Sequence, residues 1–305
     1  MSVTSVPISF VIGSRKMLTV HRLLQTCTFG IDDLVGGHLP QLPLPDPSAD
    51  GLRVLSAPYG QFEAIRASWP DHLVGGFQRY QRYYIEMAGR SYEDYLLQFS
   101  SKTRATLRRK SRKLEEYCGG SLDIRAFHGE ADVAAFLADA VPLSRKTYQT
   151  RLLNVGLPEG DDAVASMKTL ARKDELRAYI LYAHGQAISY LYLPTTGGVV
   201  TYAYLGYDPG HAHLSVGTVL QMHVLERLFG EGRYRYFDFT EGEGAHKEMF
   251  GTASIDACSF FLIKPGPANR MLIGGLKAFD GGVRLIKRLA QGSGALARVR
   301  QFLRK

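Results

Sequence analysis

The sequence predicts an α/β fold in which a mixed, mostly antiparallel sheet is flanked by helices. Three observations support this prediction. An apolar content of 45% and a charged fraction of 22% are typical of globular proteins. Short runs of β-branched and aromatic residues alternate with segments of helical periodicity. The length of 305 residues allows a substantial core in one or two domains.

The spacing of apolar residues predicts the order of the elements. Ser91 is expected to begin a helix that runs to Phe99, and His184-Gly185 to form the turn of a hairpin. Ser215 is expected to cap a helix over 216–228. The other expected helices are 100–117, 132–143 and 161–172, and the expected strands are 8–12, 53–55, 77–85, 122–127, 175–182, 186–193, 199–207 and 234–239.

Positive charge is concentrated in two segments. Residues 102–113 carry seven cations and no acid, residues 264–305 carry ten cations against Asp280 alone, and the remaining chain carries −8. In the first segment, arginines recur every four residues at positions 104, 108 and 112, where they repel one another unless solvent or an anion screens them. The first segment is therefore either a solvated face or a contact for an anionic ligand, such as nucleotide phosphates, an acidic carrier protein or transfer RNA.

The segment after Pro267 predicts a basic amphipathic helix. Its apolar face packs on the body of the protein in the favoured interpretation and lies on an anionic membrane in the alternative. That face is formed by Leu272, Leu276, Phe279, Val283, Ile286 and Ala290, with Lys277, Arg284, Lys287 and Arg288 beside it.

The sequence predicts neither export nor a metal site, since His211 and His213 near Asp208 and His223 lack the carboxylate or cysteine set that a metal site needs. No apolar run is long enough to span a bilayer, and the first residues lack the pattern of a signal peptide. Cys27, Cys118 and Cys258 are widely spaced and lack metal-ligand spacing. A cytoplasmic protein is expected, peripheral at the membrane if the tail binds lipid, without a metal or a permanently bound cofactor.

Residues 198–251 carry the strongest functional signal. Their order is strand, turn, helix, strand and charged loop. A helix entered through Ser215-Val216-Gly217-Thr218 offers free backbone N–H groups and the positive end of its dipole to an anion, although a simple helix cap explains the same residues. The loop after the second strand carries Glu241, Glu243, His246, Lys247 and Glu248.

Three motifs resemble the GNAT acyltransferase superfamily, and more closely its FemAB-like branch, which includes acetyltransferase-like proteins of cellulose and exopolysaccharide loci. They are the Tyr-Ile-Glu-Met start followed by a Ser-Lys-x-Arg helix at 101–114, the strand, turn and helix with Ser215-Val216-Gly217, and Phe237-Asp238-Phe239 followed by Glu-Gly-Glu-Gly and Lys247. The resemblance implies a GNAT domain over 101–266, a degenerate GNAT-like unit over 1–100 and a helical tail over 267–305.

The resemblance also implies the roles of individual residues. The end of the strand at Asp238 would carry the base, with Glu241, Glu243 and His246 as further candidates and Tyr207 as the acid. The donor, an acyl-CoA co-substrate, would bind at Leu205, Tyr207, Ser215, Val216, Gly217 and Thr218. Lys247 would bind a carboxylate or phosphate of the acceptor, or pair with Asp238.

Three functions follow as hypotheses. The first is transfer of an acyl group from acyl-CoA to an amine of an amino sugar, amino acid or peptide by direct attack. A hydroxyl group of a polysaccharide is an alternative acceptor. The second is Fem-like aminoacyl transfer from charged transfer RNA, which the basic helix favours. The third is a non-catalytic binding protein on a GNAT scaffold. A DNA partner is not expected.

Overall fold

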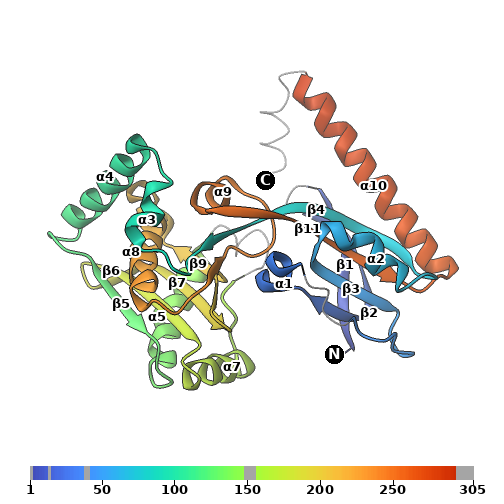
Figure 1. Ribbon diagram of the computed structural model, residues 1–305, viewed down its shortest axis with the longest axis horizontal. Helices are drawn as coiled ribbons and strands as arrows, with labels where there is room; N and C mark the ends of the chain where they lie inside the picture. Colours follow the sequence, from blue (N-terminus) through green and yellow to red (C-terminus); the bar gives the residue numbers. More distant parts are fainter. Residues whose placement is uncertain (1–2, 13–14, 38–41, 148–155, 293–305) are drawn as a thin grey trace. The chain divides into compact units, whose positions relative to one another are not determined.

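The computed structural model describes residues 3–12, 15–37, 42–147 and 156–292 (Figure 1). Contacts divide the chain into two compact units. Unit 1 comprises residues 1–82, 241–243 and 255–305, and unit 2 comprises residues 83–240 and 244–254. Residues 83–100 thus belong to unit 2, and the C-terminal helix belongs to unit 1. No helix within the described residues is long and apolar enough to cross a bilayer.

Unit 1 is built on a sheet with the strand order β1-β2-β3-β11-β4. The first two strands form an antiparallel pair, β3 lies parallel to β2, and β11 lies antiparallel to β3. Strands β4 and β11 each continue along the chain into unit 2. The bounds are β1 Val3–Ile12, β2 Arg15–Thr28, β3 Gly51–Pro58, β4 Leu73–Glu86 and β11 Ala253–Ile263.

The N-terminal strands are longer than the sequence pattern predicts. The fragments at 8–12 and 53–55 belong to ten- and eight-residue strands, and β2 was not predicted at all. The reason is that β2 reads MLTVHRLLQTC, a mixture of apolar and charged residues without clean alternation. Short helices join these strands: α1 Ile31–Gly36, the 3-10 helix η1 Tyr59–Gln61 and α2 Phe62–Ala67.

The C-terminal helix α10 (Pro267–Gly292) packs on unit 1 through its apolar face. Leu272, Ile273 and Leu276 are buried in one cluster with Val6 and Ile8 of β1. Packing on the body, the favoured interpretation, therefore describes this part of the helix. The side chains of Val283, Arg284, Ile286, Lys287, Arg288 and Ala290, and all residues after 292, lie outside the described part of the structure.

Unit 2 contains the predicted mixed sheet, with the strand order β4-β10-β8-β7-β6-β5 and with β9 paired to β7. Among the described residues, the strand pairs of this sheet are antiparallel except β8 with β10. The bounds are β5 Asp123–Phe127, β6 Leu176–Ala183, β7 Gln186–Thr196, β8 Val199–Thr201, β9 Tyr204–Tyr207 and β10 Tyr236–Asp238. The predicted α/β class, with a mostly antiparallel sheet between helices, is confirmed.

Helices cover both faces of the unit 2 sheet, as the alternation along β6 shows. Ala178 and Ile180 pack in one core cluster with α5 (Asp132–Lys146) and α7 (Asp161–Arg172). The intervening Tyr179 and Leu181 pack in the opposite cluster, which contains residues of α8. The helices that contribute to this second cluster are α3 Tyr92–Leu97, α4 Ser101–Tyr117, α8 Val216–Glu231 and α9 Ala245–Phe250.

The predicted hairpin between β6 and β7 is confirmed. Ala183 pairs with Gln186, so His184 and Gly185 form a two-residue turn. Both have positive φ, 51° and 77°, as a tight hairpin turn of this twist requires. Glycine accepts this conformation without the steric cost that a Cβ brings.

The single strand predicted over 199–207 is wrong, because the structure divides it into β8 and β9. Val200 pairs with Thr195, whereas Tyr204 pairs with Tyr192, so the register on β7 shifts by one residue between them. The extra residue lies at Tyr202-Ala203 and acts as a bulge, which lets the two halves of the segment aim in different directions. A period-two pattern cannot reveal such a shift.

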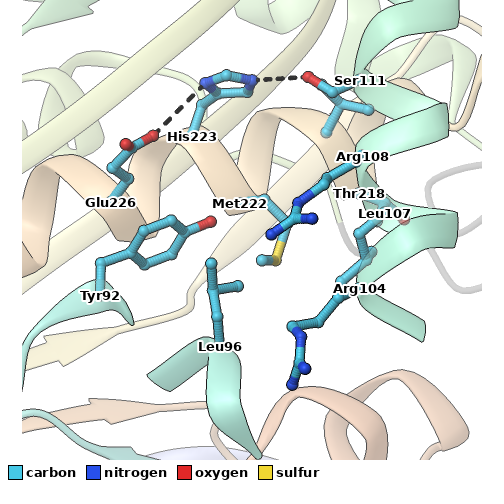
Figure 2. A pocket seen from close by; sticks show the side chains of 11 residues that line it. Tyr92, Leu96, Arg104, Leu107, Arg108, Ser111, Thr218, Met222, His223 and Glu226 are labelled. Atoms are coloured by element: carbon cyan, nitrogen blue, oxygen red, sulfur yellow. Dashed lines mark hydrogen bonds and ion pairs between the residues drawn. The ribbon is translucent and has the colours of Figure 1, made fainter. Parts of the chain in front are cut away.

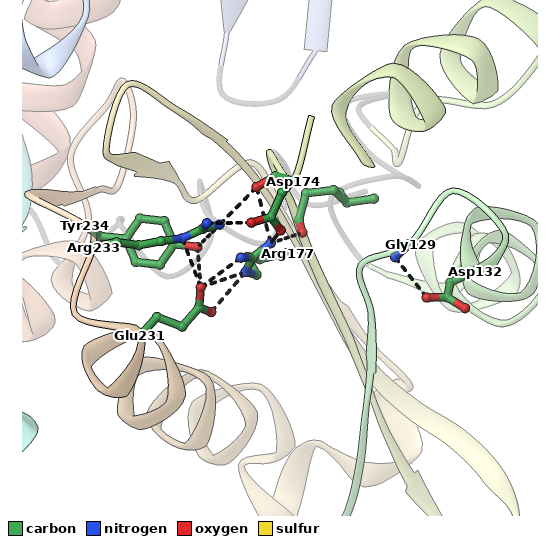
Figure 3. Close-up of polar contacts among 8 residues, drawn as sticks. Gly129, Asp132, Asp174, Arg177, Glu231, Arg233 and Tyr234 are labelled. Atoms are coloured by element: carbon green, nitrogen blue, oxygen red, sulfur yellow. Dashed lines mark hydrogen bonds and ion pairs between the residues drawn. The ribbon is translucent and has the colours of Figure 1, made fainter. Parts of the chain in front are cut away.

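An ion-pair network around the buried Arg177 joins the end of α8 to the start of β6. Arg177 is 4% exposed and donates to Glu231 at 2.8 Å and to Asp174 at 2.8 Å. Figure 3 shows Arg177 between these two carboxylates, with Arg233 bonded to Asp174 and Tyr234 bonded to Glu231. Burial opposes the charge of Glu231, but the hydrogen bonds from Arg177 and Tyr234 outweigh it and lower its pKa. Hydrogen bonds from the two arginines lower the pKa of Asp174 to about 2.

We predict that Glu231→Ala lowers the free energy of unfolding by about 3 kcal/mol, because it leaves the buried guanidinium of Arg177 without its main partner. The matched control is Glu130→Ala, which removes an exposed ion pair with Arg172 and should cost under about 1 kcal/mol. Urea unfolding followed by circular dichroism measures both. Equal losses in the two variants would contradict the role given to Arg177.

Candidate active site

The sheet of unit 2 opens between β9 and β10. Residues 199–201 pair in parallel with residues 236–238, and the Tyr202 amide donates to the Asp238 carbonyl at 2.9 Å. Beyond this point β9 pairs with β7, and among the described residues no pairing joins β9 to β10. The bulge at Tyr202-Ala203 therefore ends the parallel pairing and separates the two strand ends.

Helix α8 begins beside this opening without a side-chain cap. Ser215 occupies the N-cap position, but its backbone is left-handed (φ 57°, ψ 35°) and its side chain accepts no capping hydrogen bond. The predicted N-cap position of Ser215 is confirmed, but the side-chain hydrogen bond is missing, because a capping side chain needs an extended backbone at that residue. The first amide bonded to the Ser215 carbonyl is that of Val219, at 3.1 Å. The amides of Val216, Gly217 and Thr218 precede it in the first turn.

Gly217 brings the predicted donor-binding residues together. A Cβ at this position would lie 2.9 Å from Cδ2 of Leu205 and 3.6 Å from the ring of Tyr207, so the side chains of β9 lie directly against the first turn of α8. Tyr207 ends β9 opposite Ser189 of β7. The structure thus places Leu205, Tyr207, Ser215, Val216, Gly217 and Thr218 in one part of unit 2.

His246 of α9 is bonded to a buried glutamine of α8. Its Nε2 lies 2.6 Å from Oε1 of Gln221, whose side chain is fully buried. The imidazole ring packs 4.7 Å from the ring of Phe250 and 6.1 Å from that of Tyr202, and the residue keeps an exposed surface. Burial of the ring, together with the charges of Lys247 and Lys110, lowers the pKa of His246 below its ordinary value.

The bond to Gln221 determines which nitrogen can act as a base. With Oε1 of Gln221 facing the ring, Nε2 of His246 carries the proton and donates a hydrogen bond to that oxygen, while the buried amide nitrogen of Gln221 has no partner among the described residues. Nδ1 then keeps its lone pair. Because the pKa is lowered, the imidazole is neutral at pH 7 and can accept a proton through Nδ1.

Asp238 and Lys247 support the loop that follows β10. Asp238 is 2% exposed, and its Oδ1 accepts the amide of Thr240 at 2.8 Å. Lys247 donates to the carbonyl of the same Thr240 at 3.4 Å. Thr240 has a φ of 63°, a rare conformation for a β-branched residue, and these contacts hold it there. The burial of Asp238 favours a positioning role over direct proton transfer.

Glu241 and Glu243 belong to unit 1, whereas the other predicted site residues belong to unit 2. Glu241 accepts a hydrogen bond from Ser56 at 3.0 Å, and Glu243 accepts the amide of Gln81 at 2.9 Å. Ser56 also bonds to Tyr80 at 2.8 Å. Both carboxylates therefore have hydrogen-bond partners within their own unit.

The sequence alone did not identify Gln221 or Tyr202. Gln221 interrupts the apolar run Val219 to Leu225 one helical turn after Gly217, so an uncharged polar residue on a buried helix face was the available signal. Tyr202 gave no such signal, because its contact with His246 depends on the bulge. No cluster of three or more side chains suited to a metal ion occurs among the described residues.

Residues 101–248 match the model of the acetyltransferase (GNAT) domain. This part of the chain is a GNAT domain. The match covers the opened sheet, the start of α8 and His246.

Three solved structures of low sequence identity are similar to this chain to different degrees. FemX is 8% identical over 86% of this chain and 89% of its own, with a TM-score of 0.52. The C-terminal domain of a putative lysylphosphatidylglycerol synthetase from Agrobacterium fabrum is 12% identical over 74% of both chains, with a TM-score of 0.48. A GCN5-related N-acetyltransferase from Kribbella flavida is 11% identical over 71% and 69%, with a TM-score of 0.38. None of the curated protein sequences matches the chain.

We predict that His246 titrates below about 6.5 and that its neutral form carries the proton on Nε2. Gln221→Glu should raise the pKa of His246, because an anionic acceptor favours the imidazolium, whereas Gln221→Leu should leave it low. Nitrogen-15 NMR of the imidazole reports both the pKa and the tautomer, and His246→Gln identifies the signals. A neutral form protonated on Nδ1 would contradict the assigned bond.

Proposed function

We propose that this GNAT domain is an N-acyltransferase that moves an acyl group from acyl-CoA to the amine of an amino sugar, amino acid or peptide. The observation that supports this most strongly is the neutral, partly exposed His246 held by Gln221 in the same unit as the uncapped start of α8. Acyl transfer to an amine requires a base near the nucleophile and fixed donors for the thioester and its phosphates.

The donor would bind along β9 and the start of α8. The first-turn amides of Val216, Gly217 and Thr218 and the positive end of the helix dipole suit the phosphate oxygens of coenzyme A. Free N–H groups of the split strand near Leu205 would polarise the thioester carbonyl. A side chain at Gly217 would compete with Leu205 for space at this position.

The acceptor amine would attack the thioester carbon directly. The N–C bond forms as the C–S bond breaks, Nδ1 of His246 takes the proton from the amine nitrogen, and the departing thiolate receives a proton from the Tyr207 hydroxyl. Gln221 acts as a positioning residue that holds the imidazole in the tautomer with a free Nδ1. Lys247 would bind a carboxylate or phosphate of the acceptor.

Aminoacyl transfer from charged transfer RNA is the second candidate. The observation that favours it is helix α4, whose charged residues within 102–113 are all cationic. Phosphate contacts of such a helix would make binding strongly dependent on salt.

Acyl-CoAs of increasing chain length should raise the melting temperature, because a ligand at about a hundredfold over its Kd stabilises the folded state by roughly 2.7 kcal/mol. Thermal unfolding with coenzyme A, acyl-CoAs and transfer RNA in parallel tests the donor class. A salt-sensitive shift with transfer RNA, and none with any CoA compound, would replace the first candidate by the second.

Removing the base should affect turnover rather than binding. We expect His246→Ala to lower kcat by about 10² to 10⁴, with KM for the donor little changed. Gln221→Leu should lower kcat less, and Gln221→Glu should move the acid limb of the pH profile to higher pH because it raises the pKa of the base. The matched control is His213→Ala, an exposed histidine before α8. Unchanged kcat in His246→Ala would reject this histidine as the base.

A further inference from the structure

A pocket of about 180 Å³ lies in unit 2 between α3, α4 and α8 (Figure 2), and of the proposed donor-binding residues Thr218 also lines it. It uses another face of α8 from the one that carries Gln221, because Thr218, Met222 and Glu226 line it at four-residue intervals. Neither His246 nor Gln221 lines the pocket. It therefore has its own walls, distinct from the contacts of the proposed base.

The walls of this pocket are largely apolar. Leu96 of α3, Leu107 of α4 and Val219 and Met222 of α8 contribute side chains, together with the ring of Tyr92. A cavity of about 150 Å³ with similar walls can hold benzene, so this volume suits an apolar body of about six to ten heavy atoms. Bare inorganic ions do not match such walls, because they would lose hydration without gaining contacts.

Two cations stand together on the α4 side of the pocket. Arg104 and Arg108 are one helical turn apart, and both line it. Arg104 donates to the carbonyl of Phe99 at 2.6 Å, and among the described residues no carboxylate forms an ion pair with either arginine. Like charges at this spacing repel each other, so an anion between them would remove a cost as well as add hydrogen bonds.

The opposite side of the pocket carries a different polar set. Figure 2 shows Glu226 and His223 of α8 there, away from Arg104. His223 Nε2 lies 3.0 Å from Ser111 Oγ, and its Nδ1 lies 4.0 Å from Glu226. Ser111 donates to Glu115 at 2.9 Å. A carboxylate ligand would therefore be repelled at this side and attracted at the arginine side, which fixes its orientation.

We propose that this pocket binds a small monocarboxylate with an apolar body, its carboxylate on Arg104 and Arg108 and its body against Leu107 and Met222. Guanidinium groups match the planar carboxylate with paired hydrogen bonds. The proposal concerns a second ligand and does not depend on acyl transfer at His246.

The methyl group of Met222 provides a direct probe of occupancy. The full chain labelled with carbon-13 at the methyl groups of its seven methionines is titrated with hexanoate, and Met222→Leu identifies the resonance. The Met222 signal should shift saturably with hexanoate. The neutral 1-hexanol should bind at least about tenfold more weakly, because it cannot form charge-assisted hydrogen bonds with the arginines. Inorganic phosphate should not shift the signal.

Matched variants test separately how the arginine charge and the apolar walls contribute to the affinity for hexanoate. Arg108→Gln should raise the Kd for hexanoate about tenfold or more, whereas Arg109→Gln, on the same helix but outside the pocket, should leave it unchanged. Leu96→Phe should weaken the binding of hexanoate, because the larger side chain fills the pocket. This variant tests the site if Arg108→Gln does not fold.

Four results would overturn the proposal. They are no Met222 shift with hexanoate, equal affinity for hexanoate and 1-hexanol, equal loss of affinity in Arg108→Gln and Arg109→Gln, and competition by coenzyme A for the same Met222 shift. The last result would assign the pocket to the donor instead of a second ligand.

Discussion

The early end of the parallel pairing between β8 and β10 is the constraint on which the candidate site depends. The pairing covers three residues of each strand and stops where Tyr202 bonds to Asp238. Continuous pairing would have closed the sheet and buried the amides of β9. Because the bulge moves β9 onto β7 alone, the strand ends separate, and the start of α8 comes to lie against Leu205 and Tyr207.

Different faces of helix α8 contribute to the proposed acyl-transfer site and to the pocket beside α4. Gly217 allows close approach of β9, and Gln221, one turn later, holds His246. The neighbouring face with Thr218 and Met222 lines the pocket beside α4. The end of the same helix is fixed by the Glu231 bond to Arg177. A helix anchored at its last turn presents its first turn in a defined position, which suits preorganised binding.

The charged side chains of unit 2 divide in a similar way, into those that are ion-paired and those that line the pocket. Glu231 at the end of α8 is paired with the buried Arg177, so its charge contributes to stability. Asp174 is also paired with the exposed Arg233. The cations of α4 that line the pocket have no carboxylate partner among the described residues and remain available for a ligand. His246 belongs to neither group. Burial and the nearby lysines lower its pKa, so its imidazole is neutral.

The sequence by itself determined the fold class and most of unit 2. Helical and alternating periodicities are local, so α4, α7, the β6-β7 hairpin and the start of α8 were predicted within a few residues. The stretch around His246, which we propose as the site, was singled out from local motifs. Tertiary structure alone decided the division of 199–207, the left-handed Ser215, the Gln221 bond and the placing of Glu241 and Glu243 in unit 1. Each of these depends on register or on contacts between residues distant in sequence, which no local pattern records.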